Sequence, residues 1–156
     1  MMSTDYIVSS LPALAFGQPA PMMWERFLSV AGGVDPLSDD RRASVWTDLE
    51  TQLRNAVAEA RGGAKYVRAA TGCSLYWRNR VTACFQERDP LKRDEALDRV
   101  WWDAAGELTD VAQPLGKGAL MTYAVRLRIA LRRSAISRDR GNAAFDRLTA
   151  STRKTF

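Results

Sequence analysis

Three acidic side chains that lie close together, Asp94, Glu95 and Asp98, are the first candidates for chemistry. Paired carboxylates can serve as a general acid and a general base, because one holds a proton that the other can accept. We favour a different interpretation, a solvated helix face near a helix N-terminus, where negative charge is stabilised. No ligand of another type accompanies the three carboxylates in the sequence. Asp39 and Asp40 receive the same interpretation.

Histidine is absent from the 156 residues. This excludes histidine as a metal ligand, a general base or a switch near neutral pH, and with it every Ser-His or Cys-His mechanism. Cys73 and Cys84 are too few for a closed zinc site made only of cysteines. We predict two buried thiols in a reducing cytosol. The inventory favours a non-catalytic protein with no cofactor, no metal and no small-molecule substrate.

Arginine side chains gather in the last part of the chain. Residues 117–156 hold 10 basic and 2 acidic residues, whereas residues 1–60 hold 4 basic and 8 acidic ones, and the whole chain carries a net charge of +5. This asymmetry predicts an acidic partner for the C-terminal end: a nucleic acid, an anionic membrane surface or another protein. The alternative is a solubilising face. The predicted partner-binding arginines are Arg126, Arg128, Arg132 and Arg133.

Trp101 and Trp102 are adjacent, and neighbours on a helix point about 100° apart. One ring can therefore enter the core while the other reaches the surface as an interface anchor, a role for which Trp is favoured. Burial of both rings is the structural alternative. We include both residues among the predicted partner-binding side chains.

Two further patterns are weaker. The run Gly116-Lys117-Gly118 could hold an anion at a helix N-terminus, although it lacks the spacing of a phosphate-binding loop. Tyr76 and Trp77, followed by Arg78 and Arg80, are a combination suited to single-stranded nucleic acid, because bases stack on aromatic rings and arginine follows phosphates. No recognised nucleic-acid motif accompanies them.

The elements that must position these residues are almost all helical. Residues 6–11 are short and β-branched enough for one extended segment. A helix is expected from about Met22, with Met23, Phe27 and Val30 on one face, and a Gly-Gly pair ends it. Another is expected after a cap at Ser38. Its apolar stripe has helical spacing and consists of Trp46, Leu49, Leu53, Ala56 and Ala60.

In residues 64–88, Gly72 is expected to divide a short helix from a longer one. The longer one would place Leu75, Val81 and Cys84 near the core. Asp89 followed by Pro90 is a strong signal for a new helix. The expected inward stripe of that helix is Leu97, Val100, Trp101, Ala104 and Leu108.

Residues 117–136 are expected to form a helix central to the bundle, because it is apolar on nearly two faces. A last, separate helix is expected from about Asp139, with Ala144, Phe145 and Leu148 pointing inward. The fold class is therefore all-α. We predict a single-domain bundle of about six helices over residues 1–150, with at most one short extended segment near the start and a frayed tail at residues 151–156.

Two further properties concern location. No run of 18 apolar residues is present, so no membrane-spanning helix is expected. The apolar N-terminus lacks a basic leader and contains Asp5, so we do not interpret it as a signal peptide. We expect a cytoplasmic protein that can lie at the inner membrane surface.

Several short pieces of sequence, in fixed order, resemble a small bacterial family that accompanies V/A-type rotary ATPases. Members of that family look like diverged relatives of the C (or d) subunit of the stalk. The similar pieces are Tyr6-Ile7-Val8-Ser9-Ser10-Leu11-Pro12-Ala13-Leu14, Trp24-Glu25-Arg26-Phe27-Leu28, Leu53-Arg54-Asn55 with Ala60-Arg61, Asp89-Pro90-Leu91, Ala96-Leu97-Asp98, Trp102-Asp103, Tyr123-Ala124-Val125-Arg126-Leu127-Arg128-Ile129 and Gly141. Trp101 stands where the family pattern has Arg.

The resemblance implies an all-α protein without catalysis of its own. In the better-known relatives, a funnel of helices sits on the membrane rotor ring and receives the central axle. The implied function is an accessory or central-stalk component that links the soluble motor to the membrane rotor. Its partners would be the rotor ring, the central axle and an anionic membrane surface. The alternative is a basic α-helical nucleic-acid-binding domain.

Overall fold

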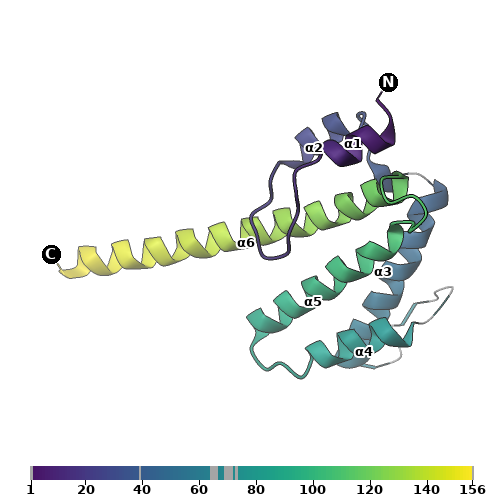
Figure 1. Ribbon diagram of the computed structural model, residues 1–156. Coiled ribbons are helices and arrows are strands. Elements are labelled where there is room, and N and C mark those ends of the chain that lie inside the picture. Colours follow the sequence, from purple (N-terminus) through teal and green to yellow (C-terminus); the bar gives the residue numbers. More distant parts are fainter. Residues whose placement is uncertain (1, 39, 64–66, 69–71, 73, 156) are drawn as a thin grey trace.

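Helix α6, Lys117–Thr155, runs the length of the structure, and the other helices gather along its first half (Figure 1). The computed structural model describes residues 2–38, 40–63, 67–68, 72 and 74–155. Within these residues the chain forms a single all-α domain with six α-helices and no strand, which confirms the predicted fold class. In chain order the elements are α1 (Thr4–Ser10), α2 (Trp24–Val30), η1 (Pro36–Ser38), α3 (Asp40–Arg61), α4 (Leu75–Cys84), α5 (Pro90–Ala105), η3 (Gly106–Leu108) and α6.

The prediction of an extended segment at residues 6–11 is wrong, because residues 6–10 belong to helix α1 and only Leu11, which follows the helix, is extended. The hydroxyl oxygen of Ser3 caps the helix by accepting a hydrogen bond from a backbone N–H in its first turn. Ile7 is buried in one cluster with Phe27 and Leu127. Packing against α2 and α6 thus overrides the β propensity of a branched side chain.

Helix α2 lies within the range expected from the sequence, and it ends before Gly32 and Gly33. Their φ angles of 101° and 84° are in the left-handed region, which glycine enters without strain. Phe27 is fully buried, whereas Met23, which we expected on the same inner face, is 66% exposed.

Helix α3 contributes one side of the main core. Its predicted stripe is buried from Trp46 through Ala56, and only Ala60, at the far end, is exposed. The stripe packs with Trp77 of α4 and Val100 of α5. Ser38, the expected cap, lies in η1 just before the helix.

Helices α4 and α5 both begin with a side-chain cap. Ser74 caps α4, and the Asp89 carboxylate accepts a hydrogen bond from the backbone of α5, whose first residue is Pro90, as predicted. Val81 and Cys84 are buried as expected, and Trp77 is buried with them. Leu75, expected near the core, is instead 66% exposed.

The first half of α6 is the centre of the domain. Its residues Leu120, Met121, Ala124, Val125, Leu127, Ile129 and Ala130 are all buried, which confirms the prediction of a helix apolar on two faces. They serve both core clusters, one shared with α1 and α2 and one shared with α3, α4 and α5.

The second half of α6 does not form the separate, inward-facing helix that the sequence predicted. The helix continues without a break to Thr155, through the predicted boundary at residue 151. Ala144 is exposed, and Phe145 and Leu148 are 68% and 70% exposed. Figure 1 shows this part of α6 extending away from the other helices. We call residues 139–155 the arm and the remainder of the domain the body; the arm is about 25 Å long by the usual helical rise.

Candidate functional site

Three of the six predicted partner-binding residues line one hollow on the body. Trp101, Arg128 and Arg132 border a space of about 460 Å³ between α3, α5 and α6. Its apolar lining is Val57, Leu97, Trp101 and Ile129, and its charged lining is Glu50, Arg54, Asp98, Arg128 and Arg132. A hollow lined by both apolar and charged side chains fits a protein segment that inserts a hydrophobic side chain next to polar ones.

The charges around this hollow are neutralised within the chain. Asp98 is buried and forms ion pairs with both Arg132 and Arg133. Glu50 pairs with Arg54 at 3.2 Å. A carboxylate that two arginines already hold is a poor general base, because its oxygens are engaged as hydrogen-bond acceptors. Asp98 therefore has a structural role. Our prediction that it lies on a solvated helix face is wrong, because its side chain is buried.

Arg128 and Arg126 are also used inside the body. Arg128 pairs with Asp35 and lies 4.4 Å above the ring of Trp24. The Arg126 guanidinium donates to the Trp102 carbonyl oxygen at 3.0 Å and lies over the same residue's ring. Burial lowers the pKa of Arg126, and the neighbouring charges of Asp103 and Arg99 act in opposite directions.

The tryptophan pair divides as its helical spacing suggested. Trp102 is buried at 6% exposure, whereas Trp101 is only partly buried and borders the hollow described above. Of the two, Trp101 is the one available to a partner.

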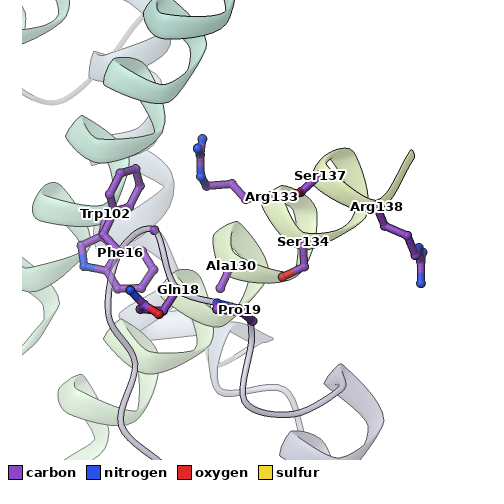
Figure 2. A pocket seen from close by; sticks show the side chains of 10 residues that line it. Phe16, Gln18, Pro19, Trp102, Ala130, Arg133, Ser134, Ser137 and Arg138 are labelled. Carbon is purple, nitrogen blue, oxygen red and sulfur yellow. The ribbon is translucent and has the colours of Figure 1, made fainter. Parts of the chain in front are cut away.

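A second hollow lies at the base of the arm, and Figure 2 shows its lining. It has a volume of about 410 Å³. The ring of Phe16 stands edge-on to Trp102, with their centroids 5.6 Å apart. The guanidinium groups of Arg99 and Arg133 lie 5.2 Å and 5.1 Å from the centroid of the Phe16 ring. Helix α6 contributes Ala130, Arg133, Ser134, Ser137 and Arg138.

The arm and the end of the body next to it carry further functional candidates. Phe145 is exposed although we expected it to face inward. Arg138, at the end of the body, and Arg140 and Arg147, on the arm, are exposed and form no ion pair with any described residue. The signal that could have found them is the absence of a helix stop between residues 117 and 155, where Gly141 is the only glycine after Gly118.

The remaining candidates are dispersed. The surface predicted for nucleic acid is partly closed, because Trp77 is buried and Arg78 and Arg80 pair with Glu59 and Asp103. Asp94 and Glu95 do not share a hollow with Asp98. The run Gly116-Lys117-Gly118 leads into the N-terminus of α6, as predicted, and nothing else there favours an anion. Asp39 and the side chain of Asp40 lie outside what the structure describes.

Of the two cysteines, Cys73 lies outside the described residues, and Cys84 is a buried free thiol. Burial raises the pKa of the Cys84 thiol, against smaller opposing effects of Arg80 and a backbone hydrogen bond. A protonated, buried thiol is unreactive. In the described part of the chain, no group of three or more acidic or cysteine side chains is arranged to hold a metal ion.

None of the described helices is long and apolar enough to cross a membrane. No protein-family model, curated protein or solved structure matches the chain. The two hollows and the arm are the features from which a function can be inferred.

Proposed function

We propose that this protein is a non-catalytic connecting component that binds one partner at the Trp101 hollow and another along the arm. The observation that carries the proposal is that one helix, α6, is both the centre of the body and the arm. A helix whose first half is locked in a core holds its second half at a fixed angle. That arrangement suits a component that joins two bodies.

In its specific form, the proposal is an accessory or central-stalk component of a bacterial V-type rotary ATPase, similar in role to the C (or d) subunit of the stalk. The support is the resemblance of short sequence pieces together with the all-helical body and its two surfaces. The partners would be the rotor ring and the central axle. The exposed arginines of the arm would suit an acidic protein of the complex or the anionic surface of the inner membrane.

A role without catalysis agrees with the chemistry of the described hollows. Catalysis by paired carboxylates needs one that is free to exchange a proton. In the Trp101 hollow, Asp98 and Glu50 are both paired with arginine. We therefore assign the hollow to binding.

The test is affinity purification of the tagged protein from gently solubilised, nuclease-treated native membranes, followed by mass spectrometry. Three forms are compared: the full chain, a chain without residues 139–156, and Trp101→Ala. Recovery of rotary ATPase subunits with the full chain, reduced by both changes, is expected. Recovery of none of these subunits from cells that contain the assembled enzyme would contradict the stalk assignment.

The alternative, a basic nucleic-acid-binding domain, is favoured by one observation, the exposed arginines of the arm. It predicts binding to an oligonucleotide that weakens steeply as salt is raised. Failure to retard DNA or RNA at low ionic strength would remove this alternative.

A further inference from the structure

Arginine recurs every seven residues along α6, at Arg126, Arg133, Arg140 and Arg147. Seven residues are close to two helical turns, so these side chains form one row along the helix. The first two members belong to the body, where Arg126 donates to the Trp102 carbonyl and Arg133 pairs with Asp98. The last two extend the row onto the arm, where no described residue pairs with them.

Next to this row runs a seam of mostly small residues with the alternating spacing of four and three that two packed helices share. Its members are Ala130, Ser134, Ser137, Gly141, Ala144 and Leu148. The first three line the hollow of Figure 2, so the face that forms this hollow continues onto the arm. Small side chains let two helix axes approach to about 8 Å. Phe145 borders the seam and supplies a large exposed apolar side chain.

The body already contains one example of a helix that places carboxylates against arginines of α6. Helix α5 packs against α6 and places Asp98 against Arg132 and Arg133, with Glu95 4.0 Å from Arg133. On the arm the arginine row continues, but Figure 1 shows no neighbouring helix there. The arm thus offers the same kind of surface to a chain from outside.

We propose that the arm binds an acidic amphipathic helix of a partner protein, which packs along the seam and places carboxylates against Arg140 and Arg147. This inference rests on the proposed connecting function and names the chemistry of the arm's partner. Flanking charges of this kind set partner choice in paired helices.

The arrangement of charge disfavours three other partners for the arm: a second copy of the arm, a polyanion and a membrane. In an antiparallel pair of arms, two arginine rows would lie opposite each other and repel. A polyanion or a membrane would favour an arm of one sign of charge, yet residues 139–155 carry Asp139 and Asp146 as well as their basic residues. Phe145 and Leu148 are the only large apolar side chains described on the arm, which is too few for insertion into lipid.

The experiment measures binding of the full chain to a labelled synthetic helical peptide of three heptads by fluorescence anisotropy. The acidic peptide carries Leu and Ala at its seam positions and Glu beside them, and the matched basic peptide carries Lys in place of Glu. We expect the acidic peptide to bind at least about tenfold more tightly than the basic one, and more weakly as salt is raised.

The decisive variant is Arg140→Glu with Arg147→Glu, which should lower affinity for the acidic peptide about tenfold. The control is Arg26→Glu with Arg88→Glu, which changes the net charge equally at exposed positions away from the arm. Both pairs should keep the helical circular dichroism of the parent. Equal loss in the two double variants, equal binding of both peptides, or no binding of either would overturn the proposal.

Three further measurements use the same proteins. An arm-dependent dimer in sedimentation velocity would overturn the proposal in favour of a second copy. Tighter binding to vesicles of anionic lipid or to single-stranded DNA than to the acidic peptide would overturn it in favour of a polyanion. If ATPase proteins co-purify equally with the Arg140→Glu, Arg147→Glu variant, only this inference fails. If the acidic peptide binds selectively but no ATPase protein co-purifies, only the stalk assignment fails.

Discussion

Asp98 of α5 and Arg133 of α6 are joined by a hydrogen bond of 3.0 Å although they are 35 residues apart in the sequence. Arg132 contacts the other oxygen of the same carboxylate. One buried carboxylate therefore links α5 by ion pairs to α6, the helix whose second half is the arm. Asp98, which the sequence offered as a candidate acid or base, therefore serves to hold two helices together through its ion pairs.

Replacing Asp98 with Ala should lower the free energy of unfolding by about 2 kcal/mol, because it removes a buried carboxylate that pairs with two partly exposed arginines. Urea denaturation followed by circular dichroism measures this. Asp94→Ala is the matched control, since Asp94 lies on the same helix without an ion pair to any described residue. Equal free energies of unfolding for the two variants would show that the ion pairs of Asp98 do not contribute to stability.

Changes on the arm should leave the stability of the body unaltered. Phe145→Asp is expected to shift the thermal midpoint little, because the side chain is 68% exposed. Phe27→Ala, at a fully buried position, should cost about 3 to 5 kcal/mol. A large loss of stability in Phe145→Asp would mean that the arm folds back onto the body, as the sequence pattern alone suggested.

Gly118 sits where α6 begins beside η3, and a methyl group on it would overlap the carbonyl oxygen of Leu108. Gly118→Ala should therefore destabilise the protein by about 3 kcal/mol, because the backbone of α6 and the backbone at Leu108 would have to move apart. Gly141→Ala is the control, because there is open space around that residue in the arm. Gly141→Ala should keep or raise the thermal midpoint, since alanine favours a helix. Equal midpoints for the two variants would contradict the predicted overlap.

Alkaline pH should unfold the protein partly through Tyr123. Its hydroxyl donates to the Pro12 carbonyl oxygen at 2.8 Å, and burial raises its pKa from 10.0 to about 12. Between these two values the unfolded chain loses the proton and the folded chain keeps it, so the free energy of unfolding falls as pH rises. Below pH 10 this group makes no difference to the pH dependence.

The measurement for Tyr123 is urea denaturation at a series of pH values from about 8 to about 12. Tyr123→Phe should remove part of the decline at the alkaline end, because phenylalanine cannot ionise. Tyr6→Phe is the control, since Tyr6 is largely exposed. An unchanged pH profile in Tyr123→Phe would refute the assignment.

Local sequence signals predicted the helices well. The Asp89-Pro90 start, the Gly32-Gly33 stop and the apolar spacing of α3 each depend on neighbours a few residues away, and the structure confirms them. The segment at residues 6–11 failed because Ile7 takes its conformation from α2 and α6, which no local pattern specifies.

The site residues were harder to predict, for a physical reason. An apolar stripe indicates that a face will be covered, but not whether the cover is the same chain or another one, so Phe145 was placed inside. In the same way, the arginines that neutralise Asp98 come from a distant helix, and its spacing on α5 alone indicated exposure. The angle between adjacent helix positions predicted that one tryptophan of the pair could be buried and the other not, but it did not say which. The expected stripe of α5 placed Trp101 inward, whereas the structure buries Trp102.

The continuity of α6 also affects how quickly the arm can be recognised. A free peptide of the arm's length would be largely unfolded in water, because starting a helix is unfavourable. Here the first turns of α6 are fixed by Ala124 and Leu127 in the core, so the helix has only to elongate into the arm. The partner proposed above would therefore meet a surface that is already ordered, and its association rate would be set by encounter and steering and not by a coupled folding step.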